Sequence, residues 1–410
     1  MEKHTIFKIV TIWFILTQTF PPFNLVMPFT GVIQMALFVG ATLLLFPKLF
    51  TKRSVIALFV YGLLSFIFFL LENAFFSSFS VVIVPFLCML SGLLIAEYAI
   101  QYDKNYDYTK MVILLVLGCD VLMSLITIPK LWERPDLIYG MNINSEMSTA
   151  DRSYYSFVIS YQTIHGLSLL IAPLVFLCKK ELRLNFNSFV IFTLITIVLL
   201  YIVIVSNGTT ALLVSLLMAT IALFINVEKF NKKNIKRLIF IGALGFLLIQ
   251  PSVLSPVLSF IQGTMDSSSG NAAKIGSIQD KLLFGESTGD LSIREDLYSN
   301  SANLFLESPI WGTSTPQLIG LHSFILDRLA LYGIIFIIPL VFVFFYNYNN
   351  MYKSLRHTKV IYVFSIMGMI FMLYMKNDFE QGTWLYGFAY LPLLCRYIDY
   401  ITDKQSTNNS

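Results

Sequence analysis

The sequence predicts an all-α integral membrane protein with about twelve transmembrane helices and both termini in the cytoplasm. Hydrophobic residues make up 56% of the chain and charged residues only 13%, too little charge to cover the surface of a soluble domain of 410 residues. Apolar runs of about twenty residues recur along the sequence, without the alternation of an outer-membrane barrel. Because lipid offers the backbone no hydrogen-bond partners, these runs are expected to be helices.

The distribution of Lys and Arg predicts the direction of insertion. With a cytoplasmic N-terminus, 20 of the 28 Lys and Arg residues fall in the inner segments, and cytoplasmic loops of membrane proteins carry such an excess. The basic N-terminal segment lacks a small-x-small cleavage site, so we interpret it as an uncleaved first helix. The expected spans lie near 5–22, 29–47, 54–71, 79–100, 110–129, 155–178, 186–206, 209–227, 236–255, 322–346, 358–375 and 383–400.

Two outer connections are long enough to suggest a function. The predicted organisation is transmembrane helices one to nine in 1–255 with an outer loop at 130–154, a large outer loop at 256–321, helices ten to twelve in 322–400 and a cytoplasmic tail at 401–410. The Ser/Gly-rich first part of the large loop is expected to be flexible. Its second part is expected to hold an amphipathic helix with a capping box at Ser292 and Glu295, an apolar face at Ile293, Leu297, Leu304 and Phe305, and an end before Pro309.

Several function classes are excluded or disfavoured by what the sequence lacks. The four Cys lie within or at the end of apolar runs and the four His are scattered, so neither metal ligation nor disulfide bonding is indicated. No phosphate-binding G-x-x-x-x-G-K-[ST] loop is present, which argues against an ATP-driven pump made from this chain alone. We therefore expect no metal, no cofactor and no nucleic-acid partner.

Arg294 and His322 are the first candidates for a catalytic site. Arg294 is one of few basic residues placed on the outer side, and a guanidinium can bind phosphate oxygens through two hydrogen bonds. His322 stands at the mouth of a long apolar run, where an imidazole can act as a general base near neutral pH. The structural alternative pairs Arg294 with Glu295 or lipid headgroups and makes His322 an interfacial cap; spacing alone favours that alternative.

Four further polar residues are candidates for binding an anionic substrate. Arg152 closes the outer loop before span six, and His165 lies further along the same span, where it must face other helices or a wet cavity. Asp327 and Arg328 follow His322 within the expected tenth span. The structural alternatives are an interhelical hydrogen bond for His165, a helix-mouth contact for Asp327 and outward snorkelling for Arg328.

The run REDLYSNSANLFLESPIWGTS and the following HSFILDRLALYGIIF resemble the signature region of the O-antigen polymerase and ligase superfamily, which includes Wzy-like polysaccharide polymerases. That family typically has an arginine opening an outer helix, a Pro-x-x-Gly turn, a His-Asn or His-Ser pair, then a leucine and a glycine. The matching residues here are Arg294, Pro309, Gly312, His322, Ser323, Leu326 and Gly333, with Arg152 similar to a second outer arginine. Where the family often has Ser-Arg-Gly, this chain has Ser206-Asn207-Gly208.

The resemblance implies a multi-pass enzyme of the bacterial inner membrane, an inverting, metal-independent glycosyltransferase of the C-type superfamily. It would act in O-antigen, lipopolysaccharide or capsule biosynthesis, with a growing glycan on undecaprenyl diphosphate as donor and the next lipid-linked repeat unit as acceptor. A chain-length regulator is a candidate partner beside the lipid bilayer. Two alternatives stay open: an O-antigen ligase of the same superfamily, and a flippase of lipid-linked oligosaccharides, although a flippase should have charged spans and short outer loops.

Overall fold

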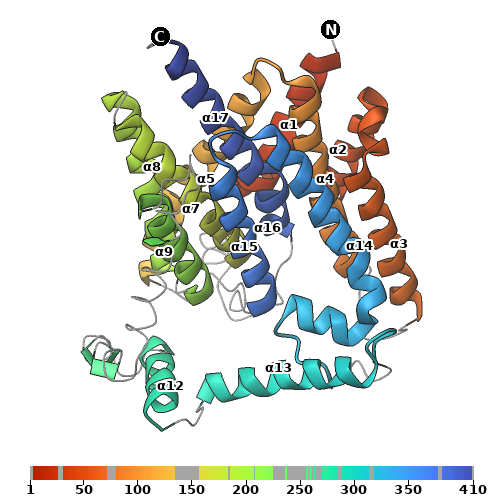
Figure 1. The fold of residues 1–410 in the computed structure, drawn as a ribbon, viewed down its shortest axis with the longest axis vertical. Helices are drawn as coiled ribbons and strands as arrows, with labels where there is room; N and C mark the ends of the chain where they lie inside the picture. The colour runs from red at the N-terminus through yellow and green to blue at the C-terminus, as the bar shows by residue number, and fades with distance from the viewer. Residues whose placement is uncertain are drawn as a thin grey trace. The chain divides into compact units, whose positions relative to one another are not determined.

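The computed structural model describes most of the chain. The described residues are 3–25, 31–71, 80–133, 157–182, 185–206, 208–224, 236–237, 255–256, 258–260, 263, 270–284, 289–313, 318–376 and 381–408. Within these ranges every regular element is a helix (Figure 1). Most of the ninth expected span, the outer loop at 130–154 beyond residue 133, and Arg152 lie outside the described residues.

The helices follow one another along the chain with short connections in most places (Figure 1). They are α1 (Lys3–Thr19), η1 (Pro21–Leu25), α2 (Gly31–Leu45), η2 (Pro47–Thr51), α3 (Arg53–Leu71), α4 (Ser80–Tyr102), α5 (Asp107–Glu133), α7 (Tyr161–Glu181), α8 (Phe186–Val205), α9 (Thr209–Phe224), α12 (Gly270–Phe284), α13 (Gly289–Glu307), α14 (Phe324–Ser354), α15 (Lys359–Met375), α16 (Gln381–Leu385), the π-helix η5 (Tyr386–Tyr390) and α17 (Leu391–Asn408).

Five of these helices are long and apolar enough to cross a membrane, which confirms an all-helical multi-pass membrane protein. They are Ile83–Tyr102, Asp107–Glu133, Tyr161–Glu181, Phe186–Val205 and Phe324–Ser354, and four shorter apolar helices are Gly31–Leu45, Arg53–Ile67, Thr210–Phe224 and Lys359–Met375. The count of twelve spans and their direction of insertion stay predictions.

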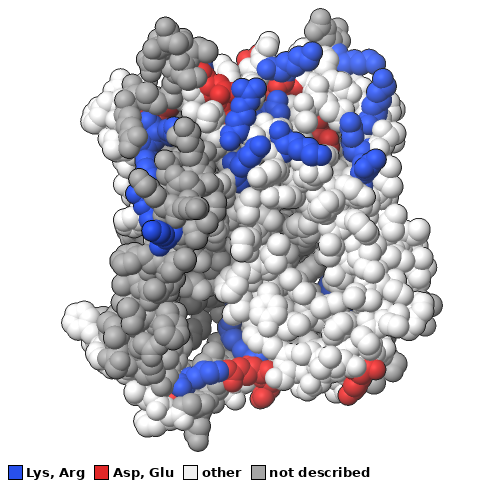
Figure 2. All heavy atoms as spheres, in the orientation of Figure 1, with Lys and Arg blue, Asp and Glu red and all other residues white. Residues whose placement is uncertain are grey.

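The chain forms two compact units. Unit 1 consists of Met1–Leu223, Phe336–Leu373 and Asp378–Ser410, and unit 2 of Phe224–Ile335 and Tyr374–Asn377. In unit 1 both termini lie at the same end, and Lys and Arg side chains gather there (Figures 1 and 2). The basic residues from which a cytoplasmic end was predicted therefore gather at this end of unit 1.

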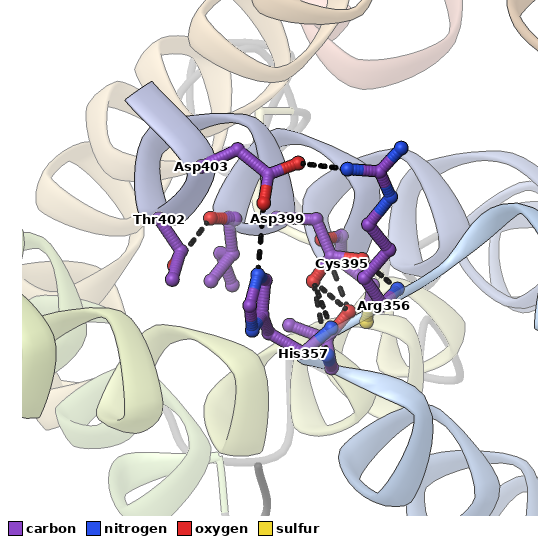
Figure 3. A network of polar contacts seen from close by, with 8 residues as sticks. Arg356, His357, Cys395, Asp399, Thr402 and Asp403 are labelled. Carbon is purple, nitrogen blue, oxygen red and sulfur yellow. Dashed lines mark hydrogen bonds and ion pairs between the residues drawn. The ribbon is translucent and has the colours of Figure 1, made fainter. Parts of the chain in front are cut away.

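Helix α17 fastens that end of unit 1 to the turn between α14 and α15 (Figure 3). The Asp399 carboxylate accepts hydrogen bonds from the backbone N–H groups of Arg356, His357 and Thr358 and from the Thr358 hydroxyl. The N–H groups that precede and open a helix lack intrahelical partners, so a carboxylate there satisfies them and favours the helix dipole. Asp403, one turn further on, binds the His357 ring at 2.9 Å and the Arg356 guanidinium at 3.0 Å.

A hydrogen bond between helices holds the buried carboxylate of Asp120 in unit 1. Asp120 of α5 is 1% exposed, and the Tyr386 hydroxyl donates to its Oδ1 at 2.5 Å. This is the structural hydrogen bond that the sequence favours for a carboxylate in an apolar run. Among the cysteines, Cys88, Cys119 and Cys395 are buried and Cys178 is half-buried, and none of the four forms a disulfide bond, as their apolar positions predicted.

Two local expectations for the second half of the chain are wrong. The serines of the Ser/Gly-rich segment lie outside the described residues, and the stretch that follows them forms α12 from Gly270 onward. Helix α13 begins at Gly289, so Ser292 lies inside the helix and cannot form a capping box with Glu295. Helix α14 is broken at Gly333, whose φ of 67° and ψ of −171° are not helical.

The break at Gly333 changes the interpretation of the tenth span. The helical pieces are Phe324–Tyr332 and Ile334–Ser354, so the uninterrupted apolar helix starts about twelve residues later than the expected boundary at 322. Asp327 and Arg328 therefore belong to a short helix before the break. The expected tenth span includes these two charged residues. The continuous helix after the break contains no charged residue until Lys353, as a membrane-spanning helix requires.

Candidate functional site

Helix α13 presents a polar face to the rest of unit 2. Arg294, Tyr298 and Ser301 follow each other at intervals of four and three residues, which places them on one side of a helix. Ser301 is fully buried, and Arg294 and Tyr298 are partly buried. Ile293, which was expected on the inward apolar face, is 59% exposed. The inward face is thus centred on Ser301, although Leu304 also contributes to it.

Helix α12 is tied to α13 by an ion pair. Lys281 of α12 contacts Glu295 of α13, and both side chains are 43% exposed. Exposed pairs of this kind contribute only about 0–1 kcal/mol each. The pair nevertheless gives Glu295 a partner on another helix, in place of the expected capping role.

His322 lies in the turn formed by residues 318–323, immediately before α14, and this turn packs on the polar face of α13. The imidazole ring is 5.8 Å from the Tyr298 ring, a usual separation for packed aromatic rings. The backbone N–H of Gly320 donates to Ser301 Oγ at 2.9 Å. A Cβ at Gly320 would overlap the backbone of Leu297, so only glycine permits this close approach.

Asp327 connects the His322 turn to α13. Its carboxylate is 2% exposed and accepts the Ser301 hydroxyl at 2.6 Å on one oxygen and the Ser323 backbone N–H at 2.9 Å on the other. Ser323 is the N-cap of α14, since its hydroxyl accepts the N–H of Leu326 at 3.2 Å. The side chain expected to bind substrate is therefore engaged within the protein, next to His322.

The end of α15 completes the surroundings of the His322 turn. The Tyr298 hydroxyl donates to the carbonyl oxygen of Met375 at 3.0 Å, and Phe324 N–H donates to that of Lys376 at 3.0 Å. The Tyr374 ring stacks on the Tyr298 ring at 6.2 Å. Tyr298 and Met375, which are 77 residues apart in sequence, thus belong to segments that contact the turn from two sides.

Two glycines of the motif allow the Pro-x-x-Gly turn to contact α14, backbone to backbone, at the break at Gly333. Gly312 and Gly333 both have positive φ, at 83° and 67°. A Cβ at Gly312 would overlap the carbonyl of Leu331, and a Cβ at Gly333 that of Ile310. Two backbone hydrogen bonds join the segments: Thr313 N–H to Ala330 at 2.7 Å, and Ile334 N–H to Pro309 at 2.9 Å.

The remaining candidates lie elsewhere. The Arg328 guanidinium bonds the Tyr332 hydroxyl at 3.2 Å and lies 5.5 Å from the centroid of the Phe324 ring, so these contacts follow its own helix. His165 belongs to α7 in unit 1, where its Nδ1 bonds the carbonyl of Tyr161 at 3.0 Å. That bond lies within one helix, in contrast to the expected interhelical bond.

The structure therefore brings Arg294, His322 and Asp327 to one part of unit 2, and Arg328 follows Asp327 on the same helix. Sequence reasoning missed Tyr298 and Ser301, although their spacing from Arg294 is a signal that could have found them. The arrangement combines a guanidinium that can bind an anion with an imidazole that can accept a proton. Within the described ranges, no group of three or more His, Cys, Asp and Glu side chains could hold a metal ion.

Comparison with known proteins gives one finding for the region that holds these residues. Residues 194–326 match a family model described as O-antigen ligase. Arg294, Pro309, Gly312, His322 and Ser323 all fall within the matched residues. A search of curated proteins found no match. This match confirms the resemblance predicted from the motifs: residues 194–326 are similar to a family of the O-antigen polymerase and ligase superfamily.

Proposed function

We propose that the chain is a glycosyltransferase that polymerises lipid-linked polysaccharide repeat units, with Arg294 and His322 at its reacting centre. The observation that supports this most directly is the hydrogen-bonded joining of α13, which carries Arg294, to the turn that carries His322, within the region matched to the superfamily. A guanidinium that could bind an anion and an imidazole that could accept a proton are thereby carried by two joined elements. A lipid-linked glycan and the bilayer fit the family match as substrate and surroundings.

The chemistry follows from the two side chains. A hydroxyl of the acceptor sugar attacks the anomeric carbon of the donor glycan, and the bond from that carbon to the undecaprenyl diphosphate oxygen breaks with inversion. His322 takes the proton of the attacking hydroxyl, and Arg294 binds the departing diphosphate, whose negative charge grows as the bond breaks. Arg152, Arg328 and His165 are proposed as further contacts to the diphosphate or glycan. In this scheme arginine supplies the charge stabilisation that a divalent cation would otherwise give.

The ligase is the second candidate, because the matched family model is described as an O-antigen ligase. Both enzymes break the same bond to undecaprenyl diphosphate and differ only in the acceptor. A flippase is a different class of protein that would move the lipid-linked unit without breaking that bond. The placement of Arg294 and His322 outside the continuous part of the tenth span supports an enzyme rather than a flippase.

Loss of the protein distinguishes the three functions by the product that remains. Without a polymerase, repeat units are still made, flipped and transferred, so acceptors should carry a single unit. Without a ligase, long chains should build up on undecaprenyl diphosphate, and without a flippase single units should accumulate on the cytoplasmic side. We expect the first outcome; long lipid-linked glycan in the deletion strain would instead identify the ligase.

Point variants test the reacting centre. Arg294→Ala and His322→Ala should abolish polymer while the protein still accumulates in the membrane. Arg294→Lys should restore little activity, since an ammonium group cannot reproduce the two parallel hydrogen bonds of guanidinium. His357→Ala is a matched control, because its ring binds Asp403 in unit 1. Normal polymer from His322→Ala would remove this histidine from the mechanism.

A further inference from the structure

The His322 turn has no regular secondary structure of its own, so something else must fix the imidazole. Residues 318–323 precede α14, and Leu321 within them has a positive φ of 53°. A non-glycine residue adopts such a backbone only where its surroundings impose it. The position of the imidazole therefore depends on the contacts on either side of it.

Those contacts converge on two side chains. Two residues before His322, the Gly320 N–H donates to Ser301 Oγ at 2.9 Å. One residue after it, the Ser323 N–H donates to Asp327 at 2.9 Å. Ser301 in turn donates to Asp327 at 2.6 Å, which closes the chain Gly320–Ser301–Asp327–Ser323 around His322.

Neither side chain is placed to meet substrate. Ser301 is 0% exposed and Asp327 is 2% exposed, and both carboxylate oxygens accept hydrogen bonds from the protein. A carboxylate would also repel a diphosphate at contact distance. We propose that Ser301 and Asp327 are positioning residues, which hold the His322 turn on α13 so that the imidazole keeps a fixed place relative to Arg294.

This inference rests on the proposed function for its consequence in catalysis. Arg294, Tyr298 and Ser301 share one face of α13. The contacts that hold the turn on Ser301 therefore also fix the position of the turn relative to Arg294. A reacting group displaced by about 1 Å can lose on the order of a hundredfold in rate. The Ser301–Asp327 pair should accordingly affect the chemical step more than substrate binding.

The kinetic test uses purified protein with lipid-linked repeat units, and Ser301→Ala beside Asp327→Asn. Each should lower kcat roughly 10- to 100-fold with KM changed by less than about twofold. The double variant should be no slower than the slower single variant, because both substitutions open the same chain of hydrogen bonds. Ser299→Ala, an exposed serine of the same helix, is the control and should resemble the parent protein.

A second measurement does not require activity. Diethyl pyrocarbonate acylates accessible neutral imidazoles, and mass spectrometry can separate His322 from the other three histidines. In both variants His322 should react faster, while His357, held by Asp403 in unit 1, should react as in the parent. A faster reaction at both histidines would mean general unfolding and would overturn the positioning role.

Three further results would also overturn the positioning role. They are a higher KM at unchanged kcat, a kcat loss in the double variant equal to the product of the two single losses, and an unchanged rate of acylation of His322. If the parent protein transfers no glycan, the proposed function fails, and the acylation result still decides whether the pair holds His322. Asp327→Asn keeps the volume of the side chain. It therefore allows both measurements to be made even if the Ser301→Ala protein does not accumulate in the membrane.

Discussion

Replacing Gly333 with alanine would force apart two segments that touch backbone to backbone. The φ and ψ of Gly333 lie in a region that is almost restricted to glycine, and a side chain there costs about 1–3 kcal/mol. The new Cβ would also overlap the Ile310 carbonyl, so the hydrogen bonds from Ile334 to Pro309 and from Thr313 to Ala330 would break. At about 0.5–1.5 kcal/mol each, the two bonds bring the local loss to roughly 2–6 kcal/mol.

Amide hydrogen exchange measures that local loss directly. A loss of roughly 2–6 kcal/mol predicts that the Thr313 and Ile334 amides exchange about 30-fold to more than 10,000-fold faster. Gly118→Ala is the control, since a Cβ there meets nothing within 4 Å and alanine suits a helix better than glycine. If Gly333→Ala leaves exchange at both amides unchanged, the two segments are not locked in the way the backbone contacts indicate.

The other predictions concern the remaining parts of the chain. Asp399→Ala should lower the free energy of unfolding of the purified protein in detergent by at least about 2 kcal/mol, because several backbone N–H groups lose their hydrogen-bond acceptor. Ser323→Asn should keep activity and Ser323→Ala should lower it, because asparagine caps a helix as well as serine does and alanine does not. A cysteine at Ser268 should react with an impermeant thiol reagent from outside and one at Asn231 should not; protection of position 268 would contradict the predicted topology. Purified protein should extend lipid-linked units in EDTA without ATP, and loss of activity there would refute the metal-free mechanism.

The sequence predicted the membrane helices well because their signal is local. A run of apolar residues of sufficient length must be helical in lipid whatever lies beside it, so α4, α5, α7 and α8 appear close to their expected positions. Helix ends were less predictable. The N-terminus of α7 at Tyr161 depends on the Ser160 cap, whereas the apolar run alone suggested 155.

The site was only partly predictable because its geometry depends on distant contacts. Arg294 and His322 stand out by residue type and by their predicted outward placement, and Gly333 by a motif. The break in α14 exists only because Gly333 meets Ile310 across the Pro-x-x-Gly turn, a contact that hydropathy cannot reveal. Likewise, the apolar positions of α13 suggested Ile293 as inward-facing, whereas hydrogen bonding of Ser301 turns the polar face inward.

The motif residues fall into two physical groups, and this division bears on how the site works. Gly312 and Gly333 act through backbone geometry, while Arg294 and His322 are the residues proposed to carry the chemistry. The His-Ser or His-Asn pair of the motif joins the groups: serine and asparagine are both good N-caps, and here Ser323 caps α14. His322 is thereby placed one residue before a helix start whose cap is bonded through Asp327 to α13. In this chain the Ser323 cap and the Asp327 carboxylate therefore fix the helix start directly behind the imidazole.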